Sequence, residues 1–180
     1  MGALAPDVVV RVATIADAER LADIGAATFH DTFGPDNTPA DMALYVVGEF
    51  GADLQRAELA DARNTVFFAE RAGQTVGYAM LRRSAAPPEV VGFDPVEVAR
   101  LYAVRQCIGM GIGATLMQRC LDESERRGHD AIWLGVWEHN ARAISFYRRW
   151  GFEDVGGHTF TLGRDRQIDR VMMRRVTREA

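Results

Sequence analysis

Three closely spaced glycines form the segment of this chain best suited to chemistry. Gly109, Gly111 and Gly113 stand between an apolar stretch that predicts a strand and an amphipathic stretch that predicts a helix. Glycine lets the backbone adopt positive φ and approach a ligand closely. The first N–H groups of a helix lack intrahelical partners and carry partial positive charge, so such a turn favours a phosphate group. A tight connection between strand and helix would use the same glycines, and the turn alone does not establish a ligand.

Two common phosphate-binding loops do not fit this turn. A P-loop requires a lysine after its last glycine, and all 21 cationic side chains here are arginine. A dinucleotide-binding loop requires the spacing GxGxxG and an acidic residue at the end of the next strand. This chain has GxGxG instead, and the next strand ends in the apolar residues of Gly135-Val136-Trp137.

A second segment identifies a third kind of loop. Residues 140–152 fit the pattern NxxAxxFYxxxGF. With the strand RLYAV, the turn GMGIG and the strand IWLGVW, this pattern resembles the core of the GNAT superfamily of N-acetyltransferases, whose glycine-rich turn binds the pyrophosphate of acetyl-CoA. The resemblance includes the expected first strand and helix around residues 11–17, so it covers essentially the whole chain.

A narrower resemblance concerns the acceptor. Several segments are similar to the bacterial spermine/spermidine N-acetyltransferase branch: TFHDTF at residues 28–33, Asp41-Met42 with Tyr45, IWLGVWE at 132–138 and GHTF at 157–160. This similarity implies a small cationic amine, with a polyamine as the first candidate. His30 and His158 fall within these segments and are candidates to line the acceptor pocket.

The resemblance implies which residues bind acetyl-CoA as co-substrate. Ala103 and Val104 would present backbone groups to the pantetheine arm, near a splay between two central strands. Asn140 would hydrogen-bond the cofactor and Ala143 would leave room for it, although Asn140 also suits a helix N-cap. The pyrophosphate would lie against the backbone of seven consecutive residues, Ile108, Gly109, Met110, Gly111, Ile112, Gly113 and Ala114.

One position departs from the family pattern. The family usually has arginine or glutamine three residues before the first glycine of its GxG pair, and Ile108 occupies that position here. Arg105 and Gln106, just upstream, are candidate replacements. Because most contacts in such a cradle come from backbone N–H groups, the departure bears on the strength of binding more than on its location.

Tyr147 and Glu97 are the predicted catalytic residues. By resemblance, Tyr147 acts as acid at the departing thiolate. A free phenol has a pKa of about 10 and a thiol about 8.5, so complete proton transfer is uphill by about 2 kcal/mol and a hydrogen bond to developing charge is expected. An alkylammonium must also lose a proton before it attacks, which costs about 4–5 kcal/mol at pH 7. Glu97 has the family position to accept that proton, directly or through water, with Glu89 and Asp94 as alternatives.

Composition limits the other possibilities. With 180 residues, 48% hydrophobic and 26% charged, the chain suits a single domain over residues 1–180. A net charge of −4 speaks against nucleic acid as a partner. No apolar run approaches the ~20 residues of a membrane helix, and the start lacks a signal-peptide pattern, so we expect a cytoplasmic protein with no membrane partner. The two cysteines show no metal-ligand spacing, and no metal is predicted.

The charge is distributed unevenly. Residues 1–97 contain 7 arginines against 15 acidic residues, a balance of −8, whereas residues 98–180 contain 14 against 10, a balance of +4. An acidic half and a basic half suit two ligands of opposite charge, although two differently decorated surfaces would give the same count.

Periodicity and turn residues predict seven strands and several helices. The expected strands are residues 8–13, 65–70, 75–82, 96–104, 131–136, 152–162 and 166–176. Helices are expected after Thr14 or Asp17, in two short segments up to about Ala62, and over residues 114–127 and 140–150. This order predicts a mixed α/β or α+β fold. The resemblance implies a mostly antiparallel sheet flanked by helices.

The sequence thus predicts an enzyme, an N-acetyltransferase that moves the acetyl group of acetyl-CoA to a small amine by direct attack in a ternary complex. Two alternatives remain: a module that binds acyl-CoA without turnover, and an acetyltransferase for a protein or antibiotic amine. The acceptor, and whether the chain forms a homodimer, are left open.

Overall fold

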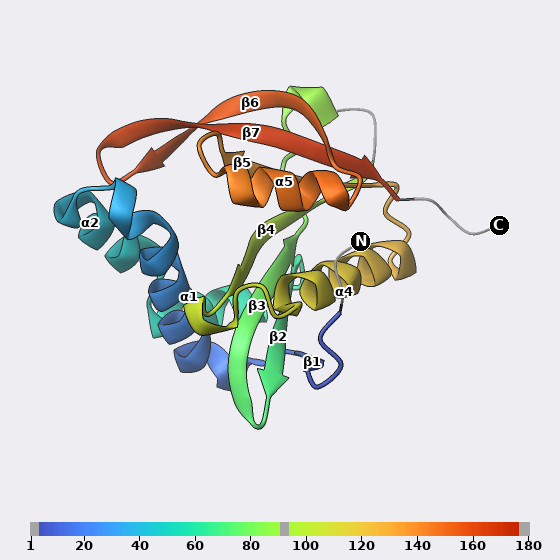
Figure 1. The fold of residues 1–180 in the computed structure, drawn as a ribbon, viewed down its shortest axis with the longest axis horizontal. Coiled ribbons are helices and arrows are strands. Elements are labelled where there is room, and N and C mark those ends of the chain that lie inside the picture. The colour runs from blue at the N-terminus through green and yellow to red at the C-terminus, as the bar shows by residue number, and fades with distance from the viewer. Residues whose placement is uncertain (1–3, 91–93, 177–180) are drawn as a thin grey trace.

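A single open sheet of seven strands organises the protein (Figure 1). This computed structural model describes residues 4–90 and 94–176. The strand order is β1-β2-β3-β4-β5-β7-β6, and every neighbouring pair is antiparallel except β4 and β5. The strands are β1 Val9–Val12, β2 Asn64–Arg71, β3 Gln74–Arg82, β4 Pro95–Ala103, β5 Ala131–Trp137, β6 Glu153–Leu162 and β7 Asp165–Arg175. This confirms the predicted mixed, mostly antiparallel sheet.

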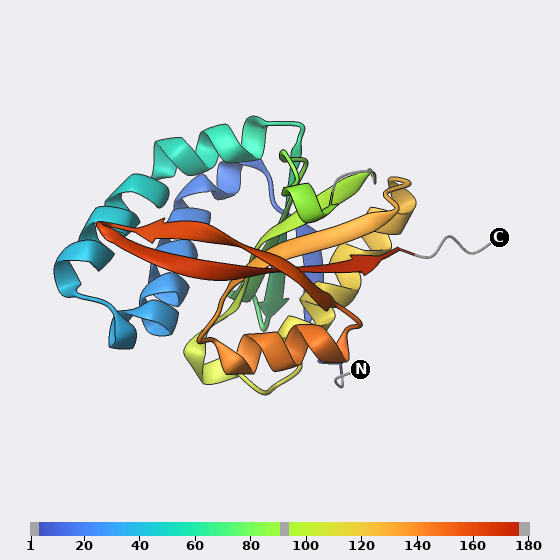
Figure 2. The same ribbon diagram turned by 90° about the horizontal axis from the view of Figure 1, so that it is seen from above.

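Helices cover both faces of the sheet (Figure 2). The α-helices are α1 Ala18–Phe33, α2 Pro39–Glu49, α3 Ala52–Ala60, α4 Ile112–Arg126 and α5 Ala141–Arg149. On one face, α1 packs Leu21 and Ile24 against Phe68 and Tyr78 of β2 and β3. Because successive strand residues point to opposite faces, Phe67 of the same strand joins the core on the other side.

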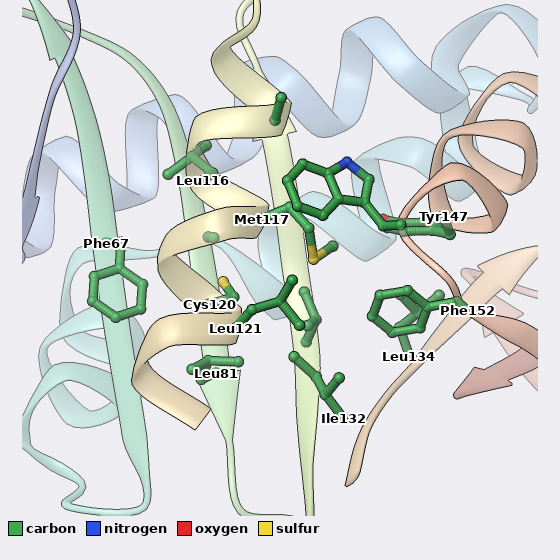
Figure 3. Packing of buried hydrophobic residues seen from close by; sticks show 14 of the residues in the cluster. Phe67, Leu81, Leu116, Met117, Cys120, Leu121, Ile132, Leu134, Tyr147 and Phe152 are labelled. Atoms are coloured by element: carbon green, nitrogen blue, oxygen red, sulfur yellow. The ribbon is translucent and has the colours of Figure 1, made fainter. Parts of the chain in front are cut away.

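That second core lies under α4 and α5. Helix α4 buries Leu116, Met117 and Cys120, whose spacing of three and four residues puts them on one helix face. Figure 3 shows this row packed against the central strands, with Tyr147 of α5 and Phe152 close to it. The core therefore holds α5, and with it Tyr147, in a fixed place beside β5.

The two parallel strands part in the middle of the sheet. Only the first three residues of β4, Pro95–Glu97, are paired with β5, where they lie opposite Ala131–Trp133. β4 then continues to Ala103 without β5 as its neighbour (Figure 1). β4 also has a bulge, because Met80 faces Arg100 while Leu81 faces Val98, which leaves Ala99 as the additional residue. The resulting opening is the predicted splay.

Some element boundaries differ from the prediction. Helix α4 begins two residues earlier, at Ile112, because Gly111 takes a left-handed conformation with φ 83° at its N-cap. Helix α5 begins at Ala141, after Asn140 as N-cap. Of the loop expected before Asp94, residues 91–93 lie outside the described residues. Within residues 4–90 and 94–176, no helix is long and apolar enough to cross a membrane.

Candidate active site

A cavity of about 820 Å³ occupies the opening between β4 and β5. Residues 98–103 of β4 and 135–137 of β5 line its two sides, and the glycine-rich turn and α5 line one end. Aromatic side chains of α1, α2 and β6 line it too. The cavity thus runs from the predicted phosphate-binding turn, past the split strands, to the segments predicted to contact the acceptor.

The glycine-rich turn has the geometry of an anion site. Gly109 and Gly111 have φ of 86° and 83°, a conformation that other residue types rarely adopt. The first intrahelical bond of α4 runs from the Thr115 N–H to the Gly111 carbonyl at 2.9 Å. The N–H groups of the three residues between them, 112–114, therefore precede the hydrogen-bonded helix and are free to bind a phosphate.

Most of the residues predicted at the turn lie on the cavity. The lining includes Ile108, Gly109, Met110, Gly111, Gly113 and Ala114. The Ile112 side chain instead points into the core, where only 1% of the residue is exposed, so its contribution is its backbone N–H. The departure at Ile108 is visible in the structure, because this apolar residue is 42% exposed on the cavity wall.

The arginines that line the cavity near the glycine-rich turn belong to α5, and not to the segment just before the turn, where they were expected. Arg105 and Gln106, the candidate replacements for the missing polar residue, are exposed and do not line the cavity. Arg142 and Arg149 of α5 do line it. They lie in a second segment of chain and were missed from the sequence because a helical arginine gives no sign of which neighbour it faces.

Asn140 and Ala143 open α5 at the cavity. The Ala143 N–H donates to Asn140 Oδ1 at 3.1 Å, which is the N-cap bond that the residue type predicts. The cap uses the carbonyl oxygen and leaves the Asn140 NH₂ group for another partner. Both residues line the cavity, so capping and cofactor contact are compatible.

Only one of the two residues predicted to contact the pantetheine arm lies on the cavity. Ala103 lines the cavity, whereas Val104 does not. The Val104 N–H donates to the Val76 carbonyl at 2.9 Å, and its own carbonyl accepts from the Cys107 N–H at 2.9 Å. The free backbone positions of this strand edge therefore lie before Val104.

Tyr147 is buried and still reaches the cavity. It is 9% exposed, packs against Phe146 and Phe152, and lines the cavity wall. Burial, with a smaller contribution from Cys120, raises the pKa of its phenol above the ordinary value of 10. The phenol therefore stays protonated at neutral pH, which suits a hydrogen-bond donor.

The opposite end of the cavity is aromatic. Phe29 stacks on Tyr45 at 4.3 Å between ring centroids, and Tyr45 meets Phe160 edge-on at 5.6 Å. Phe33 lies 6.2 Å from Trp137 of β5. All five rings line the cavity. The segments that resemble the polyamine branch thus come together here, from α1, α2, β5 and β6.

The predicted proton acceptors are not on the cavity wall. Glu97 is half-buried on β4, accepts a hydrogen bond from Ser84 Oγ at 2.6 Å and is absent from the lining. Glu89 and Asp94 are exposed and also absent from it. The acid that does line the cavity is Asp169 of β7, which nothing in the sequence singled out.

Of the histidines and cysteines considered from the sequence, only Cys107 lies on the cavity wall. His30 and His158 are exposed and do not line the cavity. Cys107 lines it beside the turn, and Cys120 is buried in the core. Among residues 4–90 and 94–176, no three His, Cys, Asp or Glu side chains are grouped so that they could hold a metal ion.

The open, mixed sheet with its flanking helices matches solved structures of N-acetyltransferases. The protein is similar to the PaiA N-acetyltransferase of Thermoplasma acidophilum, solved in complex with coenzyme A, with a TM-score of 0.76 and 17% identity over 93% of this chain and 98% of that one. That ligand agrees with the acetyl-CoA predicted here as co-substrate. The family described as Acetyltransferase (GNAT) matches residues 27–152. The chain belongs to this family and is an N-acetyltransferase.

Curated relatives agree with this assignment. An uncharacterised N-acetyltransferase of Mycobacterium tuberculosis is 35% identical over 161 residues, which are 89% of this chain and 98% of the relative. Streptothricin acetyltransferase of Streptomyces lavendulae is 34% identical over 131 residues, 70% of this chain and 66% of the relative. Their names do not identify a polyamine, so the narrower resemblance stays a prediction.

Proposed function

We propose that the protein transfers the acetyl group of acetyl-CoA to a primary amine of a small cationic acceptor, with spermidine or spermine as the first candidate. The observation that carries this proposal is one continuous cavity between β4 and β5. One of its ends has free helix N–H groups and two arginines. The other has aromatic rings, the carboxylate of Asp169 and Arg100, whose charge is paired with Glu58, and the split strands lie between the two ends. Ligands of opposite charge can therefore meet at its centre.

The cofactor fits the residues that are present. The left-handed glycines and the start of α4 suit the pyrophosphate, and Arg142 and Arg149 supply positive charge that Ile108 does not. Ala103 lines the cavity where β4 has no neighbour in β5, and the NH₂ group of Asn140 is not used by the N-cap bond. When bound, acetyl-CoA supplies an activated thioester.

Tyr147 has the proposed role of donor at the sulfur. During direct attack, the amine nitrogen forms a bond to the acetyl carbon, the carbon–sulfur bond breaks, and negative charge develops on sulfur. A buried, neutral phenol that donates a hydrogen bond there stabilises the transition state more than the ground state.

Glu97 remains the proposed acceptor of the amine's proton. Because it does not line the cavity and already accepts from Ser84, the proton would have to reach it through water.

The experiment is release of free thiol from acetyl-CoA with a panel of amines, with mass spectrometry of the products. We expect acetylation of spermidine or spermine, with kcat/KM falling as salt rises, because the balance of −8 in residues 1–97 attracts a polycation. If only neutral or anionic amines are acetylated, the cationic acceptor is wrong. If no amine is acetylated while acetyl-CoA still binds, the protein is a binding module.

An antibiotic amine is the second candidate. It is favoured by the similarity to streptothricin acetyltransferase, which covers 70% of this chain. The same panel, extended by streptothricin, distinguishes the two, since the better acceptor has the higher kcat/KM and inhibits acetylation of the other.

A further inference from the structure

Asp169 is the only acidic residue among the described residues that line the cavity. Its Oδ1 atom is buried and has no hydrogen-bond partner in residues 4–90 and 94–176. A buried polar group without a partner is unfavourable, and the penalty is larger when the group is charged. The position therefore calls for a ligand that donates hydrogen bonds or carries positive charge.

The sheet register aims this carboxyl at the cavity. Asp169 of β7 is paired with Trp137 of β5 on one side and with His158 of β6 on the other. The side chains of directly opposed residues in antiparallel strands point to the same face of the sheet. Next to them, β5 has Gly135. A Cβ atom there would lie 3.3 Å from Asp169 Oδ2 and 3.1 Å from the His158 ring. The missing side chain leaves the carboxyl open to the cavity beside the split strands.

The surroundings suit an ammonium ion. Trp137 presents a ring next to Asp169, and Tyr45 and Phe160 line the same end of the cavity, so cation–π contacts are available. Of the ionisable groups that face this end, Arg100 of β4 is paired with Glu58 at 2.7 Å. Tyr45 of α2 is neutral at ordinary pH, because burial raises its pKa to about 12. Tyr102 of β4 also lines the cavity, and burial raises the pKa of its phenol well above 10. His158 of β6 lies opposite Asp169 in the sheet without lining the cavity.

Physical chemistry decides which nitrogen this carboxylate should bind. An ion pair stabilises the protonated form of an amine, and the protonated form has no lone pair with which to attack. The contact therefore helps a nitrogen that does not react. An acceptor with two amino groups can keep one of them charged at the carboxylate while the other, neutral, attacks the thioester.

We propose that Asp169 binds the non-reacting ammonium group of the acceptor, and that the enzyme thereby selects aliphatic diamines and polyamines over monoamines. This rests on the proposed function and names the residue that carries its specificity. Burial raises the pKa of Asp169 to about 6, with the nearby His158 opposing the shift. The anchor should consequently gain strength as the pH rises through that value.

The test compares spermidine with butylamine, which lacks the second charge, in the wild-type protein and in Asp169→Asn. We expect the KM for spermidine to rise at least tenfold in the variant, as for a lost hydrogen bond to a charged group, with kcat within threefold. The KM for butylamine should not change. Asp169→Glu, which keeps the charge, should recover part of the loss.

Controls separate this role from others. Asp122→Asn removes one exposed charge on α4, outside the cavity lining, and should leave both KM values unchanged. In the wild type, the KM for spermidine should fall as pH rises through about 6. In His158→Asn the fall should persist but move to higher pH, because His158 lowers the pKa of Asp169. In Asp169→Asn the fall should be absent. Calorimetry with acetyl-CoA should give the same Kd for the wild type and Asp169→Asn, which verifies that the variant is folded.

Three outcomes in Asp169→Asn would overturn the inference. The KM for spermidine could be unchanged, or the KM values for spermidine and butylamine could rise by the same factor. A decrease confined to kcat would instead make Asp169 a proton acceptor. If no amine releases thiol, the proposed function fails. Calorimetric binding of spermidine to the CoA complex then decides alone: a Kd at least tenfold lower for the wild type than for Asp169→Asn supports the anchor, and equal or absent binding refutes it.

Discussion

Replacement of Gly111 tests the phosphate end of the cavity. This residue is the N-cap of α4, with φ 83°. Gly111→Asp and Gly111→Asn both impose the strain of a left-handed conformation, roughly 1–2 kcal/mol for an L-residue and least for these two types. They have nearly the same shape and differ by one negative charge, so a comparison of the two variants isolates the charge.

The charge should act in opposite directions on the free and the liganded protein. At a helix N-terminus a carboxylate stabilises the helix by about 0.3–1 kcal/mol. Against a phosphate charge at about 5 Å, with an effective dielectric constant near 20, it is repelled by about 3 kcal/mol. Without ligand, the Gly111→Asp protein should therefore be at least as stable as Gly111→Asn. Its Kd for acetyl-CoA should nevertheless be about 100-fold higher.

The assay is thermal unfolding with acetyl-CoA at 100 times the wild-type Kd. That concentration stabilises the wild type by about 2.7 kcal/mol, or roughly 5–11 °C for a protein of this size. A further 100-fold weakening in the aspartate variant leaves at most about 0.4 kcal/mol, close to 1 °C. NAD at the same concentration should shift no variant appreciably. Equal shifts by acetyl-CoA in the two variants would refute the placement of the pyrophosphate at this turn.

Three further predictions concern single side chains. Tyr147→Phe should lower kcat about 100-fold and leave the Kd for acetyl-CoA within twofold, because the phenol acts on charge that develops in the transition state. A kcat within twofold of the wild type would make Tyr147 a packing residue. Glu97→Gln should flatten the acid limb of the kcat/KM profile against pH, and an unchanged limb would assign the proton to another route. Hydrogen bonds from Arg126 and then Arg127 lower the pKa of Glu123, whose side chain is 4% exposed, to about 2. Glu123 should thus contribute about 3 kcal/mol that is present above pH 5 and lost as the pH falls towards 2, and Glu123→Gln should reduce both the Tm at pH 7 and its dependence on pH in that range.

Structural features that depend only on residues close together in the sequence were predictable. The left-handed glycines at Gly109 and Gly111, the N-cap at Asn140 and the turns at Gly73 and Gly163 all follow from residue type and short-range geometry. Apolar periodicity likewise gave seven strands in the right places, because each strand must bury one face or both.

The site's charges depended on the tertiary structure. Whether an arginine of α5 faces the turn or the solvent is decided by how α5 packs on the sheet, and Arg142 and Arg149 proved to line the cavity whereas Arg105 did not. Glu97 was expected at the site by resemblance, yet the bulge at Ala99 and the short pairing of β4 with β5 leave it off the cavity wall.

Asp169 shows the same limit most clearly. A lone aspartate in a strand is read from the sequence as a solvent-facing residue. Here the sheet order brings β7 between β5 and β6, so that Trp137 and His158 become its neighbours although they lie 32 and 11 residues earlier in the chain. Strand order and register are properties of the whole sheet, set by packing among distant segments, and they alone placed a carboxyl at the aromatic end of the cavity.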